Sequence, residues 1–369
     1  MKYLIFIFII ITNLICQSNS KECPCGNDQL CKPLEIEPRK EFIGFSVNST
    51  HYPYYNWDTL TTIGIFYQEE IEDKLLCMAK TLGVRLVYSA FYPVDQLSNQ
   101  THIDEWINQQ LELVQSTFTD GLNFDVEDPI TDPIVAKQYT QLVAATNNAF
   151  KSVNPYYQIS VDVAWDSSNC IDERCYDYVG LSKASDFLVV MDYDMQSRVY
   201  TKTCVASANS PPSLVLAGML NFTKLGIDEN SLVMALPWYG YNYPCIGMNY
   251  TLQTFECIIP PSNYLGCNCS DASGIEINYS IIMDMLNDTS IANGGLQWDS
   301  EFESPYFNFI DLFTGTQHQM WFDNPQSLNI KVTVARSMNL RGVGVWNIDQ
   351  LWQDPNLSSE MWGALNSFF

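Results

Sequence analysis

A repeating pattern of eight short apolar segments constrains the fold of this chain more than any other feature. The segments cover residues 41–47, 61–67, 84–90, 121–127, 158–165, 186–194, 232–240 and 342–349. Runs of this length are typical of parallel strands that are buried on both faces. Helical patterns lie between several of them, including residues 102–118 and 133–153, and Pro133 suits a helix start. Eight strands alternating with helices predict an α/β fold of the TIM (β/α)8 barrel type.

Residues 241–325 interrupt this rhythm after the seventh segment. The stretch is rich in Cys, Asn, Tyr and Pro, and it lacks the strand–helix alternation of the rest of the chain. We expect it to form a disulfide-rich insertion at the rim of the barrel. The expected organisation is therefore one barrel domain over residues 21–369 with this insertion inside it.

The first twenty residues have the order of a secretory signal peptide. Lys2 precedes the apolar run YLIFIFIIITNLIC, and the small polar residues QSNS follow it. The run is short for a membrane span, which needs about 20 apolar residues, although a signal anchor is the alternative. We expect cleavage after Ser20 or Ser18, and a mature protein without a membrane partner.

Cysteine usage agrees with an exported chain. There are twelve cysteines, and Cys16 would leave with the signal peptide, so at least one of the remaining eleven is free or paired between chains. The C-x-C spacings and only three scattered histidines disfavour zinc, and we expect neither a metal nor a cofactor. Eight glycosylation sequons predict a glycosylated surface: Asn48, Asn99, Asn221, Asn249, Asn268, Asn278, Asn287 and Asn356.

The net charge of −24 argues against nucleic acid as a partner, because phosphate groups would be repelled. Two interpretations of the acidic composition stay open. It is either a solvated acidic surface or an adaptation to an acidic compartment.

The segment DGLNFDVED, residues 120–128, places carboxylates in a stretch that otherwise resembles a buried strand. Because side chains alternate along a strand, Asn123, Asp125 and Glu127 share one face, and Glu127 would stand at the carboxyl-end mouth of the barrel. A calcium site is one alternative, but Asp128 and Asp132 lie on the other face or beyond Pro129. The second alternative is a purely structural role, in which buried carboxylates are satisfied by backbone or arginine partners.

The ends of three later strands carry aromatic and acidic residues. They are Tyr193 and Asp194 in MDYD, Tyr239 in PWYG, and Trp346 in VWNID. Rings stack on the C–H face of a sugar, while carboxylates protonate and orient it. Their convergence at one barrel mouth predicts a sugar-binding pocket.

These motifs resemble glycoside hydrolase family 18, the chitinase family. DGLNFDVE is similar to its D-G-x-D-x-D-x-E signature. The segments KECPCGNDQLC, VDVAW, RCYDYVG, FLVVMDYD, PWYGY, WFDNPQS and RGVGVWN resemble a lysosomal branch of that family, and together they span nearly the whole mature chain. The resemblance implies hydrolysis of the GlcNAc-β-1,4-GlcNAc (chitobiose) core of N-linked oligosaccharides from its reducing end. It also implies a retaining, substrate-assisted mechanism.

The resemblance also implies a role for each residue of the site. Glu127 would be the general acid and base, Asp125 would hold the 2-acetamido N–H, and Tyr193 would donate to the acetamido oxygen. The implied substrate-binding residues are Trp346 as the floor under the sugar, with Asp194, Tyr239 and Asn123.

Asn123 stands where chitinases of this family carry the middle Asp of the signature, whereas the lysosomal branch has DGINIDIE there. Since an amide removes one like charge, we expect Asp125 to ionise more readily. Asp125 would then stay anionic in an acidic lumen while Glu127 remains protonated.

Two other functions remain as alternatives. A secreted chitinase would need an open groove lined by tryptophans such as Trp238, Trp298 and Trp321. A lectin of the same fold would bind sugar without hydrolysis, but such proteins typically lose the acid that Glu127 supplies. The expected partner is an oligosaccharide with 2-acetamido sugars, the expected state a monomer, and the expected location the lysosome, with secretion as the alternative.

Overall fold

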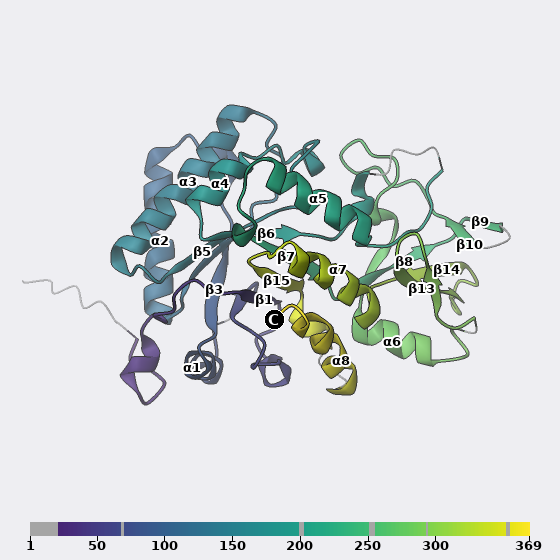
Figure 1. Cartoon of the computed structure of the whole chain (residues 1–369), viewed down its shortest axis with the longest axis horizontal. Coiled ribbons are helices and arrows are strands. Elements are labelled where there is room, and N and C mark those ends of the chain that lie inside the picture. The colour runs from purple at the N-terminus through teal and green to yellow at the C-terminus, as the bar shows by residue number, and fades with distance from the viewer. Residues whose placement is uncertain (1–20, 68–69, 199–202, 251–254, 293, 352–354) are drawn as a thin grey trace, which may run out of the picture.

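The computed structural model describes residues 21–67, 70–198, 203–250, 255–292, 294–351 and 355–369. Eight parallel strands form a closed barrel in the order β1-β15-β7-β6-β5-β4-β3-β2 (Figure 1). Their bounds are β1 Glu41–Ser46, β2 Thr62–Ile65, β3 Arg85–Ala90, β4 Gly121–Phe124, β5 Gln158–Ala164, β6 Phe187–Met191, β7 Leu232–Pro237 and β15 Gly342–Trp346. The predicted barrel is confirmed. The predicted signal peptide lies outside the described residues.

Helices cover the outside of the barrel, as the long coiled ribbons in Figure 1 show. Their bounds are α1 Asp73–Leu82, α2 Gln100–Thr117, α3 Pro133–Val153, α4 Tyr178–Ala184, α5 Pro212–Lys224, α7 Pro325–Ser337 and α8 Pro355–Asn366. Helix α3 begins at Pro133 as predicted, and Asp132 caps it by accepting a hydrogen bond from Ile134 N at 2.7 Å. None of the described helices is both long and apolar enough to cross a membrane.

Alternation along the strands divides the apolar residues between two cores. One core lies between the strands and the helices, and it includes Phe42, Leu122 and Phe124. A smaller core fills the barrel interior with Ile43, Phe45, Phe187, Val189, Val233 and Ala235. Phe66, Tyr193 and Trp346 pack partly buried against this interior core, which therefore supports the residues at the mouth.

Every predicted strand is present, but several end earlier than expected. Strand β4 ends at Phe124 rather than at residue 127, and β6 ends at Met191 rather than at residue 194. The polar and aromatic residues beyond these ends leave the ladder and line the mouth. In the sequence these residues continue the period-two alternation of a strand, and the pattern therefore overestimated the lengths of β4 and β6.

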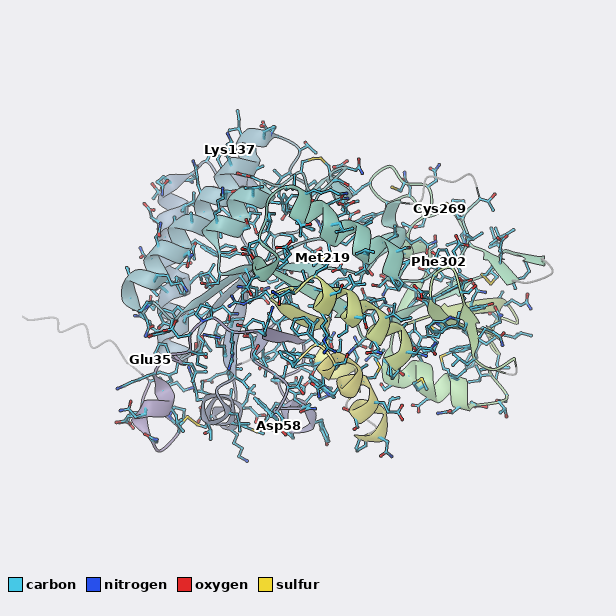
Figure 2. All side chains as sticks on the ribbon, in the orientation of Figure 1. Glu35, Asp58, Lys137, Met219, Cys269 and Phe302 are labelled. Carbon is cyan, nitrogen blue, oxygen red and sulfur yellow. A yellow bond between two sulfur atoms is a disulfide. The ribbon has the colours of Figure 1, made fainter. Side chains whose placement is uncertain are left out.

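The insertion after β7 forms its own antiparallel sheet of five strands in the order β11-β8-β14-β13-β12. Their bounds are β8 Tyr239–Pro244, β11 Ile275–Asn278, β12 Gln297–Asp299, β13 Ser304–Ile310 and β14 Gln317–Trp321. A hairpin of β9 Gly247–Tyr250 and β10 Phe255–Ile258, together with helix α6 Tyr279–Asn287, completes it. In Figure 2, Cys269 and Phe302 mark this insertion at one end of the molecule, and Lys137 on α3 lies at the other.

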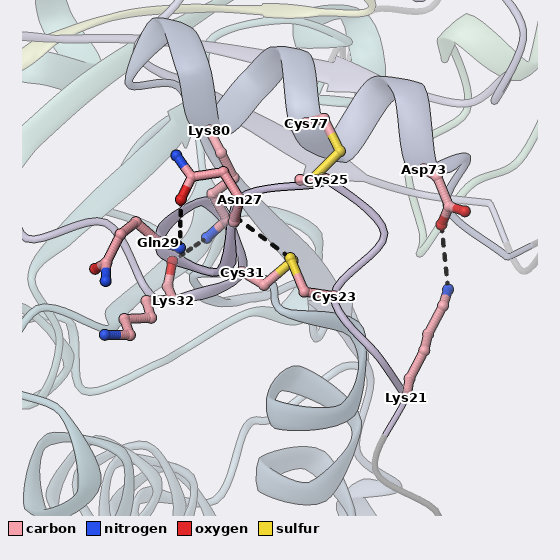
Figure 3. The surroundings of a disulfide bond; sticks show 10 residues. All are labelled: Lys21, Cys23, Cys25, Asn27, Gln29, Cys31, Lys32, Asp73, Cys77 and Lys80. Carbon is pink, nitrogen blue, oxygen red and sulfur yellow. Dashed lines mark hydrogen bonds and ion pairs between the residues drawn. A yellow bond between two sulfur atoms is a disulfide. The ribbon is translucent and has the colours of Figure 1, made fainter.

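Five disulfides cross-link the described residues, and Cys267 is the one free cysteine among them. Cys25–Cys77 fixes the N-terminal segment to α1, and Cys23–Cys31 closes a short loop within that segment, as Figure 3 shows. Cys204–Cys269 and Cys245–Cys257 hold the insertion, and Cys170–Cys175 closes a loop after β5. The disulfide-rich character predicted for the insertion is confirmed.

The first and last strands of the barrel meet where it closes. Strand β1 pairs with β15 in a register that joins Glu41 to Gly342. The Glu41 carboxylate is buried beneath the barrel, 3.5 Å from Arg341 and 3.8 Å from Arg85. Since lone buried charges are costly, these ion pairs fix the closure at the N-terminal end of the strands.

Candidate active site

The acidic residues within positions 120–128 lie at different depths of the barrel. Asp120, at the start of the strand, is buried and accepts hydrogen bonds from Lys80 Nζ at 2.6 Å and from the backbone N of Leu34 and Leu86. Asp125 lies just beyond the end of β4, where its backbone N donates to Ala90 O at 3.1 Å. The Glu127 side chain is 49% exposed at the mouth. Glu127 is thus accessible to a substrate, while Asp125 lies beneath it.

Asn123 lies one layer below Asp125 and is fully buried. Its Nδ2 donates to Asp162 Oδ2 at 2.6 Å, and its Oδ1 accepts from Ser160 Oγ at 2.6 Å. Asn123 does not line the cavity at the mouth, so the geometry does not support the direct sugar contact expected for it. Its amide instead orients the buried carboxyl of Asp162 on β5.

The environment of Asp125 disfavours its charged form. Burial, and then the neighbouring carboxylate of Glu127, raise the pKa of Asp125 to about 7, although Arg174 opposes the shift. Burial and the proximity of Asp125 likewise raise the pKa of Asp162 well above its usual value. Burial and Glu127 thus work against the expectation that Asp125 stays anionic at acidic pH, which remains a prediction. The amide at Asn123 removes one like charge, but it does not offset desolvation.

Arg174 is the site residue that reasoning from the strand ends missed. Its Nη2 donates to Glu127 Oε2, and its Nε donates to the backbone O of Glu127 at 3.1 Å. The loop closed by Cys170–Cys175 carries it. Arg174 is 47 positions from Glu127 in the chain, and no pattern in the sequence indicates this contact.

The segment after β6 and strand β8 bring a carboxyl and three tyrosines together. Asp194 Oδ1 accepts from Tyr239 Oη at 2.7 Å and from Tyr241 Oη at 2.8 Å. Burial raises the pKa of Asp194, and the two phenol donors oppose this rise. Tyr193 meets Tyr239 edge to face, with ring centroids 6.0 Å apart. The predicted Tyr193, Asp194 and Tyr239 thus converge, and Tyr241 joins them.

Trp346, at the end of β15, forms an aromatic surface of the same mouth. Phe66 meets it edge to face at 4.8 Å, and Phe45 packs below it at 5.7 Å. These contacts fix the plane of the indole ring, which remains only partly buried. The ring is therefore available to stack on a sugar.

The cavity at the mouth has two adjoining lobes that share Glu127, Met191, Tyr193 and Asp194. One lobe, about 210 Å³, adds Asp125, Tyr239 and Trp346 to these shared residues, and we call it the tryptophan lobe. The other, about 300 Å³, adds residues of the β5–α4 loop and of the insertion, and we call it the arginine lobe. Its additional residues are Ala164, Trp165, Asp172, Arg174, Tyr241, Tyr264, Ser270, Asp271, Ala272 and Gly274.

The only group of His, Cys, Asp and Glu side chains among the described residues that is spaced to hold a metal ion is Cys23, Cys25 and Cys31. All three sulfur atoms are in disulfides, so they cannot serve as thiolate ligands. The cavity at the mouth is lined by carboxyls, phenols, one guanidinium and aromatic rings.

Comparisons with known proteins identify the family of the chain. The model of "Glycosyl hydrolases family 18" matches residues 88–350. The chain is 83% identical to "Probable di-N-acetylchitobiase 1" of Dictyostelium discoideum, over all of this chain and 99% of the relative. It is 35% identical to the di-N-acetylchitobiase of Homo sapiens, over 93% of this chain and 88% of the relative.

A solved structure of similar fold is the class V chitinase of Nicotiana tobaccum. Its TM-score is 0.69 at 14% identity, and the match covers 90% of this chain and all of the chitinase. This likeness concerns the fold alone. The family match and the relatives above carry the conclusion that this chain belongs to glycoside hydrolase family 18.

Proposed function

We propose that this protein hydrolyses the β-1,4 bond between the two GlcNAc residues of the chitobiose core of N-linked oligosaccharides. The observation that carries the proposal is the arrangement of Glu127 at the junction of two lobes, with Asp125 beneath it and Trp346 and Tyr193 beside it. The high identity to relatives named di-N-acetylchitobiase supports the choice of substrate.

In the proposed reaction the tryptophan lobe holds the sugar whose anomeric carbon reacts. Trp346 supports its ring face, Asp125 accepts a hydrogen bond from the 2-acetamido N–H, and the Tyr193 hydroxyl donates to the acetamido oxygen. Glu127 protonates the glycosidic oxygen as the acetamido oxygen attacks C1, so an oxazolinium forms and no enzyme carboxylate acts as nucleophile. Glu127 then accepts a proton from the water that opens the ring, which retains the anomeric configuration.

Asp194 and Tyr239 would orient the bound sugar. The carboxyl of Asp194 is held by Tyr239 and Tyr241, and all three border the tryptophan or the arginine lobe. Asp194 thereby presents its remaining oxygen toward a sugar hydroxyl in a fixed direction.

The cavity fits a short oligosaccharide better than a chitin chain. Its two lobes measure about 300 and 210 Å³, so the joined cavity lies within the range of about 300–1,000 Å³ typical of small-molecule sites. Of the tryptophans considered for an open groove, Trp238 and Trp321 are buried and Trp298 alone is exposed. These positions favour chitobiose-sized substrates over the polymer, and the presence of Glu127 favours catalysis over lectin-like binding.

Replacement of the general acid tests the proposal. We expect Glu127→Gln to lower kcat on di-N-acetylchitobiose by about 10²–10⁴-fold, with the thermal unfolding temperature and binding of the sugar retained. Glu173→Gln serves as a matched control, since it changes the same residue type in the nearby loop without lining either lobe. Unchanged turnover in Glu127→Gln would refute the mechanism, and wild-type binding without turnover would identify a lectin.

We further propose action as a monomer in the lysosome, with the predicted leader directing export. Support comes from the predicted signal peptide, the sequons and the net charge of −24. Fractionation of cells that express the tagged full-length chain should place the processed protein with acid hydrolases. Recovery mainly in the medium would favour the secreted alternative.

A further inference from the structure

A second cavity lies at the floor of the barrel, at the end opposite to the candidate active site. Its volume is about 380 Å³, against about 300 and 210 Å³ for the two lobes at the mouth. Five of its lining residues are the first residue of a barrel strand or the residue before it: Glu41, Arg85, Gln158, Phe187 and Arg341. Because the barrel strands are parallel, these residues meet at one end. We call this space the floor cavity.

The floor cavity collects positive charge in a chain whose net charge is −24. Arg85 and Arg341 line it, and their ion pairs among the described residues are both with Glu41, at 3.8 and 3.5 Å. Arg39 lies beside them: burial lowers its pKa, Glu41 opposes this, and the two lining guanidinium groups lower it further. Since one carboxylate cannot neutralise three guanidinium groups, two positive charges remain in excess.

Hydrogen-bond donors are in excess at the same place. Arg85 Nε, Arg341 Nε and Gln158 Nε2 are buried and have no hydrogen-bond partner among the described residues. The guanidinium of Arg341 has five N–H groups, but its one acceptor there is Glu41 Oε1 at 3.5 Å, which is longer than an ordinary N–H···O bond. Every unpartnered buried polar atom of the lining residues is a donor. Because unpaired buried donors are destabilising, the floor cavity is complementary to a ligand with negative charge and acceptor oxygens.

The two lining guanidinium groups are held in place by the fold itself. Arg341 lies over the ring of Phe187, with its central carbon 5.4 Å from the ring centroid, and its backbone N donates to Glu229 O at 3.0 Å. Arg85 Nη2 donates to Ile36 O at 2.6 Å. The groups are therefore preorganised, and a ligand would not have to order them.

The outer part of the floor cavity fits more than a single ion. Its volume falls in the range of about 300–1,000 Å³ typical of small-molecule sites. Glu37 and Asp186 supply carboxylate oxygens that can accept from hydroxyl groups, and Tyr156 supplies a ring. Lys151 donates to both oxygens of Asp186 at 3.0 Å, so this pair is neutral and leaves the excess positive charge unchanged.

We propose that the floor cavity is a binding site for a small hydroxylated phosphate monoester, such as a sugar phosphate, whose phosphate group pairs with Arg85 and Arg341. Guanidinium groups match phosphate oxygens in a two-donor geometry. A phosphate monoester carries a charge of about −1.5 to −2 at pH 7, which matches the excess of the site. The site is separate from the mouth, so the inference goes beyond the proposed function and its test does not use turnover.

Calorimetric titration of the protein at pH 7.5 with glucose 6-phosphate, glucose and inorganic phosphate tests the proposal. We expect one molecule of glucose 6-phosphate to bind per chain, no binding of glucose, and at least tenfold weaker binding of inorganic phosphate. A hundredfold excess of the ester over its Kd should raise the thermal unfolding temperature by about 3 °C or more, because a ligand that binds only the folded state stabilises it.

Two variants locate the site. Arg341→Gln removes one of the lining charges and should weaken binding of glucose 6-phosphate at least tenfold. Gln158→Glu keeps the shape of the side chain but adds the missing negative charge. It should abolish binding and raise the unfolding temperature of the protein without ligand. Arg336→Gln, on the exposed side of α7, and Arg174→Gln, at the mouth, each remove the same charge elsewhere and should bind as the wild type does.

Each other result counts against the proposal. Absence of binding by the wild type overturns it, and so does unchanged affinity in Gln158→Glu or in a folded Arg341→Gln. Loss of binding in Arg174→Gln would place the anion at the mouth and also overturn it. Inorganic phosphate that binds as tightly as glucose 6-phosphate would overturn the choice of an ester. If Arg341→Gln does not fold, Gln158→Glu and Arg174→Gln decide.

Discussion

At the scale of single residues, carboxyls that are close in the sequence have different surroundings. Asp120 has the buried ammonium of Lys80, Glu127 has the guanidinium of Arg174, and Asp125 has no cation in direct contact among the described residues. Proximity along the chain therefore predicts neither the charge nor the function of a carboxyl. The cationic partners of Asp120 and Glu127 come from segments 40 or more positions away in the chain.

The raised pKa of Asp125 predicts a pH-dependent stability. The folded value of about 7 exceeds the unfolded value of about 3.9, so the folded state binds the proton more tightly. The resulting stabilisation is complete below pH 3.9 and is lost as the pH rises through 7. Relative to Asp125→Asn, which cannot titrate, the wild-type free energy of unfolding should fall by up to about 4 kcal/mol between pH 4 and 8.

Urea unfolding of both proteins across this range measures the difference. The exposed Asp95→Asn is the control and should differ from the wild type by a constant amount. A flat difference for Asp125→Asn would show that Asp125 is ionised in the folded protein at acidic pH.

At the scale of elements, the apolar periodicity was enough to predict all eight barrel strands and the place of the insertion. It could not predict that the insertion contains a five-stranded sheet, because the strands there are short and partly polar. The alternation of Tyr239, Tyr241 and Tyr243 is a period-two signal that could have revealed β8. The contact of Arg174 with Glu127 depends on how two loops fold over the barrel, which local patterns do not encode.

The first residue of β4 illustrates how closely the barrel strands pack. Gly121 has a φ of +145°, and a Cβ at this position would lie 1.9 Å from Gln158 O on β5. Gly121→Ala should therefore lower the free energy of unfolding by about 2 kcal/mol or more, through backbone strain and displacement of β5.

Helix α8 offers a control for Gly121→Ala, because it also contains a glycine that can be replaced by alanine. A Cβ at Gly363 would meet no atom within 4 Å, so Gly363→Ala should leave stability unchanged or raise it by up to about 1 kcal/mol. Thermal unfolding of the two variants beside the wild type makes the comparison. Equal stabilities would contradict the strand contact at Gly121.

At the scale of the whole molecule, the pairing of the cysteines predicts the thiol chemistry of the mature protein. Five disulfides use ten cysteines, and Cys267 is buried and free. Alkylation followed by mass spectrometry should label Cys267 alone, and only after denaturation. A native, non-reduced sample should run as a monomer on gel filtration. A disulfide-linked dimer, or a label on another cysteine, would contradict the pairing.

The closure of the barrel by its first and last strands also determines how the protein has to be made. Glu41 and Arg341 are 300 residues apart in the chain. At about 5–20 residues per second, strand β1 emerges from the ribosome roughly 15–60 s before β15 can cover its edge. During that interval its unpaired backbone is available to any other strand, which is the situation that favours aggregation. We therefore expect the yield of folded protein to depend on how well this strand edge is shielded until translation ends.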